Sequence, residues 1–372
     1  MATPLKDLYN TTFFDAFLKQ VLLVVPDFDT TNFLEQLLDE NWDNLALKQR
    51  MRHITLVLAQ HLSPLGNYEA QLAVLLEILR KLKAAPKHAE SIEYLFLPDY
   101  VAHFGLESYA TSVAALAEIT PFITAEFAVR PFLMQYPVVM LAQMKVWATD
   151  PNEHIRRLAS EGCRPRLPWG MALKTYQKDP QLILPILELL KNDPSEYVRR
   201  SVANNLNDIA KDDPELIIEI AKDWYGNTTQ TDALVKHATR TLLKQGNQEL
   251  MQLFGFGATD QIKIEKLKIK NPVLQLGEYL YFDFELQNLA EKATLIRLEY
   301  AIYYLKANGS LSRKVFKISE KEYSAQSTTS IERKQHFKPI STRKYHFGQH
   351  QLALIVNGVE QPKFDFELCH NL

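Results

Sequence analysis

The chain has little of what disulfide, metal and cofactor sites are made from. Its 372 residues include only two cysteines, Cys163 and Cys369, which cannot build a disulfide framework and lack metal-ligand spacing. It also has no glycine-rich phosphate-binding loop and no recognisable nucleophile–base pair. We therefore expect no metal and no organic cofactor. A reducing cytosol is the simplest setting for so few cysteines.

Long apolar runs are absent as well. No run approaches the roughly twenty residues that a membrane span requires, and the first residues lack the charged-then-apolar order of an export signal. We expect a cytoplasmic protein that makes no contact with a membrane.

Length and composition favour two domains. Of the 372 residues 47 % are apolar, which is enough to bury full cores. The charge is unevenly divided, because residues 261–372 hold 17 Lys and Arg against 12 Asp and Glu, and the preceding residues hold 25 against 32. A basic region beside an acidic one suits a polyanion partner only if the charges cluster on faces, which composition does not show.

Residues 1–120 predict helices throughout. Apolar residues recur there at helical spacing, glycine is scarce and proline marks the joints, as in a stack of antiparallel helices. The predicted helices are Thr11–Val25, Asn32–Leu38, Leu45–Leu62, Asn67–Leu82 and Ser108–Leu116.

A repeat begins near residue 121. The segment Asp150–Ala159, DPNEHIRRLA, recurs 43 residues later as Asp193–Val202, DPSEYVRRSV. Each copy follows an apolar helix, predicted over Phe132–Trp147 and Leu182–Lys191. Paired helices at this period indicate a HEAT-like solenoid, whose stacking creates a concave surface.

The letters shared by the two copies predict a helix start. The aspartate is the expected N-cap, the proline is the first helical residue, and Glu153 or Glu196 closes a capping box. A looser third copy follows in Pro214–Tyr225 and Asp232–Lys244.

After Gly246 the sequence predicts strands. Apolar and polar residues alternate in several short segments, and Asn308-Gly309 and Asn357-Gly358 are hairpin-turn signals. The predicted strands are Ile262–Ile269, Tyr279–Leu286, Leu295–Leu305, Lys314–Ile318, Ser330–Phe337, Gln351–Val356 and Lys363–Leu368. Seven short strands suggest an immunoglobulin-like β-sandwich, an assignment that rests on strand count because no cysteine pair links the sheets.

The second helix of each repeat carries a polar stripe. In the first copy Arg157 and Glu161, four residues apart, lie away from the predicted buried side, and in the second copy Arg200, Asn204 and Asp208 line the exposed side. Because a solenoid sets such stripes side by side, these five residues form one predicted polar patch. The third copy adds Lys236, His237 and Arg240.

Simpler interpretations of these residues stay open. Arg157 and Glu161 are also spaced for an ordinary ion pair worth about a few tenths of a kcal/mol. Glu126 has Arg130 one turn later, which offers a structural pairing. Trp169, in a proline-rich loop, fits an aromatic that only docks that loop.

Five segments of the sequence form a recognisable set, and those in the middle of the chain are specific in both residues and spacing. They read MRHITLVLA from Met51, ITAEFAVRPFL from Ile123, HIRRLASEGCRPRLPW from His154, SEYVRRSVANNLNDIAKD from Ser195 and VKHATRTLLK from Val235. Together they closely resemble the AlkC branch of the AlkD-like DNA glycosylases. The resemblance implies excision of cationic N-alkylated bases such as 3-methyladenine, with duplex DNA held on the concave face and no flipping of the base. One subgroup carries an immunoglobulin-like domain, which residues 261–372 resemble.

The same resemblance implies a catalytic set of Glu126, Glu161, Trp169 and Asp208. An N3-alkylated adenine is already cationic and leaves without protonation, whereas its sugar gains oxocarbenium character that nearby carboxylates stabilise. Trp169 would offer its ring to the deoxyribose, and one carboxylate would orient the attacking water.

Cations beside the carboxylates would hold DNA phosphates and give affinity without sequence choice. The candidates are Arg157, Arg164, Arg166, Arg200, Lys236, His237 and Arg240. In the tail, Arg333–His350 interleaves basic and aromatic residues. Its loop over residues 338–344, with Lys338, Arg343 and Lys344, is predicted to be a minor-groove or backbone arm. An ordinary cationic loop between two strands is the alternative.

We therefore predict a multidomain α-then-β protein, with an all-helical HEAT-like catalytic domain over residues 1–257 and an immunoglobulin-like β-sandwich over residues 258–372. The predicted function is that of a monofunctional alkylpurine DNA glycosylase of base excision repair. It acts as a monomer on double-stranded DNA containing alkylated bases, and it is nucleoid-associated when bound. The alternative is a non-catalytic HEAT-repeat scaffold that binds DNA or protein, for which acidic residues among the arginines would have little use.

Overall fold

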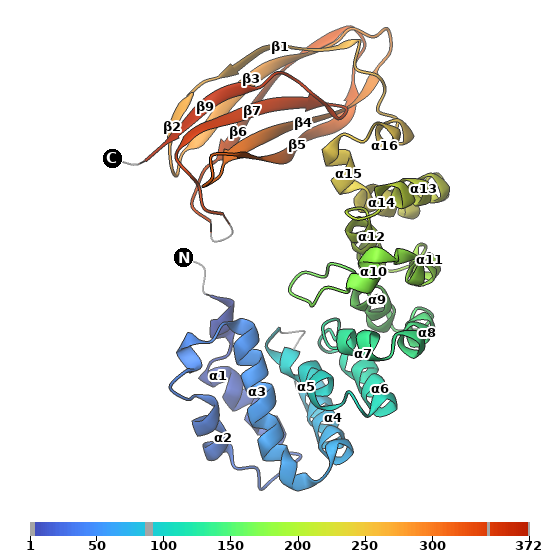
Figure 1. Cartoon of the computed structure of the whole chain (residues 1–372), viewed down its shortest axis with the longest axis vertical. Coiled ribbons are helices and arrows are strands. Elements are labelled where there is room, and N and C mark those ends of the chain that lie inside the picture. The colour runs from blue at the N-terminus through green and yellow to red at the C-terminus, as the bar shows by residue number, and fades with distance from the viewer. Residues whose placement is uncertain (1–3, 86–91, 341–342, 371–372) are drawn as a thin grey trace. The chain divides into compact units, whose positions relative to one another are not determined.

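The computed structural model describes residues 4–85, 92–340 and 343–370. The chain forms two compact units, Met1–Asp213 with Trp224–Ala238, and Pro214–Asp223 with Thr239–Leu372. Helices build the first unit, and strands dominate the second (Figure 1). The predicted order of helices followed by strands is confirmed. The predicted boundary at residues 257–258 falls between the last helix and the first strand.

The helical unit is assembled from short amphipathic helices. Most begin and end within a few residues of their predicted positions, because their apolar residues recur at helical spacing. The helices are α1 (Thr11–Leu22), α2 (Thr30–Leu37), α3 (Leu47–Leu62), α4 (Tyr68–Ala84), α5 (Phe96–Phe104), α6 (Tyr109–Ile119), α7 (Val129–Gln135), α8 (Pro137–Trp147), α9 (Glu153–Gly162), α10 (Lys174–Lys178), α11 (Leu184–Leu190), α12 (Glu196–Ile209) and α14 (Thr229–Ala238).

Two predicted helices are wrong as single elements. The helix expected over Phe132–Trp147 is divided between α7 and α8, because Pro137 disfavours helical geometry at Tyr136. The helix expected over Asp232–Lys244 is interrupted at Thr239, whose φ of −89° and ψ of 4° lie outside the helical region.

The repeat predicted from the sequence is present as stacked helix pairs. Figure 1 shows α9, α12 and α14 in succession along one side of the helical unit, with α8 and α11 along the other. Helix α9 packs against α8, α11 and α12, and α12 packs against α14. This arrangement places the polar stripes of α9 and α12 next to each other.

The predicted capping of the repeat helices is wrong. The N-caps are Asn152 and Ser195, two residues after the expected aspartates. Asp150 Oδ1 instead accepts a hydrogen bond from Asn152 N at 2.8 Å, and Asp193 Oδ1 accepts one from Ser195 N at 2.8 Å. Each aspartate therefore forms a turn before the helix, because an Asp side chain bonds the backbone two residues on as readily as it caps. Glu153 closes no capping box and accepts a hydrogen bond from Ser195 Oγ.

The first arginine of each repeated Arg-Arg pair stabilises the turn that precedes its helix. Arg156 Nη1 donates to the carbonyls of Asp150 and Pro151, both at 3.0 Å. Arg199 Nη1 donates in the same way to Asp193, at 2.6 Å, and to Pro194, at 3.0 Å. The residues that the two copies share therefore have largely structural roles.

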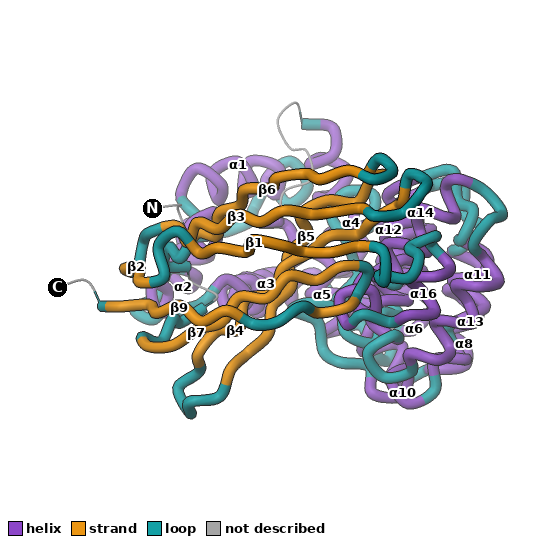
Figure 2. The backbone as a smooth tube through the Cα atoms, turned by 90° about the horizontal axis from the view of Figure 1, so that it is seen from above, coloured by secondary structure: helices purple, strands orange, loops and turns teal. Residues whose placement is uncertain are grey.

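The second unit is a β-sandwich preceded by short helices, α15 (Arg240–Gln245) and α16 (Gln248–Leu253), and by most of α13 (Pro214–Trp224). One sheet has the order β1-β3-β6, and the other has the order β2-β9-β7-β4-β5 with β8 paired to β7. Figure 2 shows the strands in orange. They are β1 (Ile262–Ile269), β2 (Val273–Gln275), β3 (Tyr279–Asn288), β4 (Thr294–Leu305), β5 (Leu311–Tyr323), β6 (Ser327–His336), β7 (Gly348–Val356), β8 (Val359–Glu360) and β9 (Phe364–Cys369).

All seven predicted strands are found, and two were missed. Strands β2 and β8 have three and two residues, too few to show an alternating pattern. Alternate residues of β3, among them Phe282 and Phe284, enter a shared core with residues of the other sheet. Both hairpin turns are present, and Asn357 and Gly358 have the positive φ values, 46° and 80°, that a two-residue turn requires.

Within the described ranges, no helix is both long enough and apolar enough to cross a membrane.

The two cysteines lie in different environments. Cys163 is fully buried at the end of α9, and its thiol lies 3.4 Å from Asn205 Nδ2. Burial raises the pKa of the Cys163 thiol to about 12, whereas Cys369 is partly exposed. A thiol reagent at pH 8 is therefore expected to modify one thiol per native chain and two after denaturation, because only thiolate reacts. Modification of both thiols in the native protein would contradict this placement of Cys163.

Candidate active site

The three predicted carboxylates come from successive parts of the helical unit. Glu126 lies just before α7, Glu161 in the last turn of α9, and Asp208 in the last turn of α12. The loop after α9 carries Trp169. Since α9 and α12 pack side by side, residues more than forty positions apart in sequence meet at one end of these helices.

Ion pairs join the three carboxylates into a continuous chain. Its order is Glu126, Arg157, Glu161, Arg164, Asp208 and Lys211. Successive N···O distances are 2.6, 3.6, 2.6, 2.9 and 3.0 Å. Because acids and bases alternate, each carboxylate has a cation beside it, and the repulsion expected among three clustered carboxylates is offset.

This chain of ion pairs is largely buried, whereas the sequence predicts that its residues form an exposed stripe. Glu161 is 4 % exposed and Asp208 is 2 % exposed. Burial alone would lower the pKa of Arg157, but Glu126 and Glu161 raise it above its ordinary value. The same balance, with Glu161 and Asp208 as the acids, raises the pKa of Arg164. The two arginines therefore stay charged inside the protein.

The simple pairing of Glu126 with Arg130 is not found. Glu126 Oε2 accepts hydrogen bonds from Arg157 Nη1 at 2.6 Å and from Thr124 Oγ1 at 2.8 Å. Arg130 is fully buried and points instead to the backbone, where Nη1 donates to Gly162 O at 2.8 Å and Nε to Met171 O at 2.8 Å. The four-residue spacing would suit an ion pair within a helix, but Glu126 precedes α7, and two backbone carbonyls take the Arg130 guanidinium instead.

Arg130 therefore anchors the loop that carries Trp169. This loop is also held by Lys48 of α3, whose Nζ donates to Trp169 O at 2.7 Å. Trp169 is 58 % exposed and has a φ of 65°, a left-handed conformation that is costly for a bulky residue. Strain of this kind persists where the surroundings determine it, and it is common at functional sites. An aromatic buried to dock the loop would not be so exposed.

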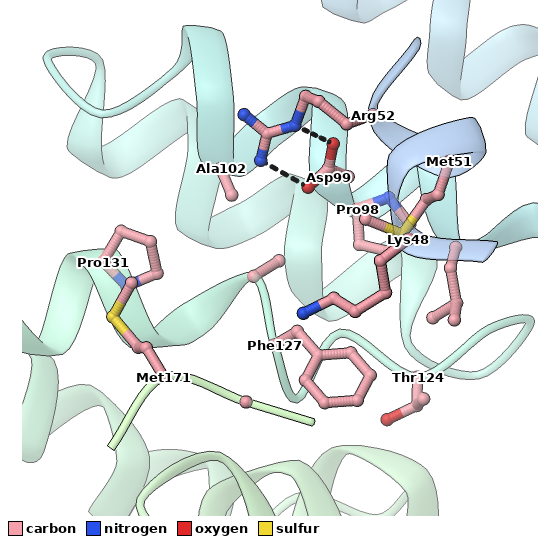
Figure 3. Close-up of a pocket in the computed structure, with 13 residues that line it drawn as sticks. Lys48, Met51, Arg52, Pro98, Asp99, Ala102, Thr124, Phe127, Pro131 and Met171 are labelled. Carbon is pink, nitrogen blue, oxygen red and sulfur yellow. Dashed lines mark hydrogen bonds and ion pairs between the residues drawn. The ribbon is translucent and has the colours of Figure 1, made fainter. Parts of the chain in front are cut away.

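A cavity of about 310 Å³ adjoins this loop and is lined by α3, α5 and the start of α7. Figure 3 shows the Lys48 ammonium beside the Phe127 ring, and the two groups are 5.5 Å apart. Arg52 forms a two-point ion pair with Asp99, with both N···O distances at 2.8 Å. Gly170 and Met171, which follow Trp169 in this loop, form part of the cavity wall.

Three of the cations predicted to contact phosphates, among them Arg157 of the ion-pair chain, are engaged with carboxylates from other parts of the helical unit. The Arg164 side chain is 8 % exposed and joins Glu161 to Asp208, so it has no open face for a phosphate. Arg166, which is 40 % exposed, pairs with Asp212 at 2.5 Å. The sequence prediction missed the pairs with Asp208 and Asp212 because these carboxylates lie more than forty residues after the arginines.

The remaining predicted cations lie in several places. The Arg200 side chain is 67 % exposed and pairs at 3.3 Å with Glu196 on the same helix. His237 of α14 lies 3.1 Å from Asn204 of α12, and Lys236 precedes it. Arg240 begins α15, which belongs to the second unit.

The predicted tail arm has three described cations. Lys338 and Lys344 are exposed, and the Arg343 guanidinium stacks over the Tyr304 ring at 3.9 Å. Residues 341 and 342 of the predicted loop lie outside the described residues.

Four residues of the site were not predicted. Lys211 neutralises Asp208, Thr124 bonds Glu126, Tyr197 lies 4.8 Å from the Arg157 guanidinium, and Lys48 holds the Trp169 loop. The spacing of Lys211, three residues after Asp208 at the end of α12, was a usable signal. Nothing local marks Lys48, which lies 121 residues before its partner.

Metal ligands do not gather in the described parts of the chain, where no three His, Cys, Asp or Glu side chains are placed to hold an ion.

Two family models match separate parts of the chain. The model of the DNA alkylation repair enzyme family matches residues 34–242, and that of the YhaZ C-terminal Ig-like domain matches residues 263–370. This chain belongs to the DNA alkylation repair enzyme family. The uncharacterized protein YhaZ of Bacillus subtilis is 41 % identical over 365 residues, which are 98 % of this chain and 99 % of YhaZ.

One solved structure matches the chain over both units. Pseudomonas fluorescens alkylpurine DNA glycosylase AlkC, bound to DNA containing an abasic site analog, matches with a TM-score of 0.92 and 37 % identity. The match covers 99 % of this chain and 100 % of that chain. The predicted resemblance to the AlkC branch, with a helical repeat region and an immunoglobulin-like C-terminal domain, is therefore confirmed.

Proposed function

We propose that this repair-family protein is a monofunctional DNA glycosylase that excises cationic N-alkylated bases, such as 3-methyladenine, from duplex DNA without flipping them. The observation that carries the proposal is the chain of three ion-paired carboxylates, together with the exposed Trp169 on the loop that follows α9. It occurs in a protein 37 % identical to an alkylpurine DNA glycosylase. A pure DNA-binding scaffold would have no use for carboxylates held at this place.

The chemistry needs negative charge near the sugar and no general acid. A cationic alkylated base leaves without protonation, while positive charge develops at C1′. A carboxylate about 4 Å from that charge, at an effective dielectric near 20, gains about 4 kcal/mol before desolvation. If half of this gain is specific to the transition state, the rate rises about thirtyfold.

The contacts of two carboxylate oxygens support this role. Among the described residues, no hydrogen-bond donor reaches Glu161 Oε2 or Glu126 Oε1, while the other oxygen of each accepts from an arginine. Both oxygens of Asp208 have cations beside them, Arg164 at 2.9 Å and Lys211 at 3.0 Å. We therefore assign the sugar and the attacking water to the two glutamates and a supporting charge to Asp208.

A monofunctional mechanism fits the lysines nearest the site. Lys48 Nζ donates to Trp169 O, and Lys211 Nζ donates to Asp208 Oδ1. These contacts support structural roles for both amines, whereas a lyase requires a lysine amine free to attack the sugar.

The test is release of free 3-methyladenine from methylated duplex DNA, measured by mass spectrometry under single-turnover conditions. We expect base release without strand cleavage, and no release of uracil, whose neutral ring is a poorer leaving group. The absence of 3-methyladenine release would favour the non-catalytic scaffold. Efficient uracil release would contradict the reliance on a cationic leaving group.

The tail cations give a separate prediction. If Lys338, Arg343 and Lys344 each contact a phosphate, replacing all three with glutamine lowers the salt-dependence slope of DNA binding by roughly 3. Substitution is cleaner than truncation at residue 258, because Asn357 Nδ2 bonds Gly257 O at 2.9 Å within the second unit. The matched control replaces Lys263, Lys266 and Lys268 of β1, and an equal effect from both triple variants would remove the assignment of the arm.

A further inference from the structure

The geometry points to Arg164 as a positioning residue for base excision, which holds Glu161 and Asp208 in one fixed relative orientation. Arg164 Nη1 lies 2.6 Å from Glu161 Oε1, and Arg164 Nε lies 2.9 Å from Asp208 Oδ2. The two carboxylates belong to different repeats, on α9 and α12. This inference rests on the proposed glycosylase function and assigns a residue to it.

Arg164 is suited to hold two carboxylates at once. A guanidinium presents its donors in a rigid fork, so a single planar group fixes both partners in distance and direction. Its side chain is only 8 % exposed, and those of Glu161 and Asp208 are 6 % and 3 % exposed. In this setting water competes weakly for the three groups, and the ion pairs hold one geometry.

The fork also determines which oxygens are left for the reaction. Arg164 takes Oε1 of Glu161 and Oδ2 of Asp208, which leaves Glu161 Oε2 for the reaction and Asp208 Oδ1 for Lys211. Asp208 Oδ1 meets Lys211, whose side chain is 41 % exposed and therefore lies on the accessible side. Without Arg164 each carboxylate could rotate, and the charge facing the sugar would lose its fixed position.

A phosphate contact, the role that the sequence suggested for Arg164, would give a different result. An arginine that binds phosphate contributes to affinity in the ground state and changes the dissociation constant when it is removed. A positioning arginine changes the rate constant of the bound complex and leaves affinity nearly unchanged. The two roles are therefore separated by measuring rate and affinity independently.

The experiment compares wild type, R164K, R164Q and R164A in single-turnover release of 3-methyladenine at saturating protein. Affinity is measured separately with duplex DNA containing an abasic-site analogue. We expect R164Q and R164A to be slower by at least about tenfold while the dissociation constant changes by less than about threefold. R164K retains the charge without the fork and should fall between wild type and R164Q.

Chemical rescue separates positioning from a general loss of folding. Guanidinium ion at low millimolar concentration should restore part of the R164A rate, whereas sodium at equal ionic strength should not. The matched control is R297A, because Arg297 is a buried arginine of the second unit that pairs with Glu299 at 2.6 Å and Glu320 at 2.9 Å. R297A should keep a wild-type rate constant and show no response to guanidinium.

A lowered affinity with an unchanged rate constant would overturn the inference and return Arg164 to phosphate binding. A slow R164A that guanidinium does not rescue, or an R297A that behaves like R164A, would also overturn it. If wild type itself releases no base, the proposed function fails and the inference fails with it. Failure of the inference alone is recognised by an active wild type.

Discussion

Replacing Glu161 with glutamine is expected to slow release of 3-methyladenine by about thirtyfold, the loss that corresponds to about 2 kcal/mol of transition-state stabilisation. Glutamine preserves the shape of the side chain, and its amide oxygen can still accept the 2.6 Å hydrogen bond from Arg164 Nη1. The substitution therefore removes the negative charge with little change in geometry. Its effect should appear in the rate constant of the bound complex.

Single-turnover release at saturating protein measures this effect. The control is E118Q, because Glu118 lies on α6 in an exposed ion pair with Arg80, away from the carboxylate chain. E118Q should keep the wild-type rate. A wild-type rate for E161Q as well would mean that the charge of Glu161 takes no part in the reaction.

Replacing Arg130 with methionine is expected to lower the free energy of unfolding of the helical unit by about 3 kcal/mol. Arg130 is fully buried and donates to Gly162 O and Met171 O, at distances of 2.5 to 2.8 Å. Burial lowers the pKa of Arg130 to about 10, so the group is still charged at neutral pH. Methionine fills the space but leaves the carbonyls of Gly162 and Met171 without these donors.

Urea denaturation followed by tryptophan fluorescence reports on this unit, because the four tryptophans all belong to it. R80M is the matched control, since the Arg80 side chain is 53 % exposed and its ion pairs lie on the surface. The R80M substitution should lower the free energy of unfolding by no more than about 0.5 kcal/mol. An R130M protein as stable as R80M would show that these carbonyl bonds contribute little.

The strands and most helices could be predicted because their signals are local. Strand β1 was predicted with its observed bounds, Ile262–Ile269, because alternation of apolar residues reports directly on a half-buried strand. The turn at Asn357-Gly358 follows from the conformational freedom that its positive φ values need. By contrast, Asp150 could either cap a helix or form a turn before it, and the sequence does not distinguish these local hydrogen bonds.

The candidate site was harder to predict because its contacts are long-range. The family resemblance identified Glu126, Glu161 and Asp208 as catalytic candidates. The arginines between them, however, were expected to contact DNA phosphates. Whether Arg164 meets Asp208, 44 residues away, depends on the rotation of α9 against α12, which no periodicity specifies. The partners of Arg130 are backbone carbonyls, and every residue has one, so no sequence pattern marks them.

The most direct test of the central claim, that ionised carboxylates accelerate base loss, uses a protein that lacks two of them. Free 3-methyladenine released from methylated duplex DNA is measured for wild type and for the variant E161Q/D208N, both shown to be bound to the DNA. The account predicts rapid release by wild type and at least about a hundredfold slower release by the variant, since each charge contributes separately to stabilising the sugar cation. Equal release by the two proteins would contradict it.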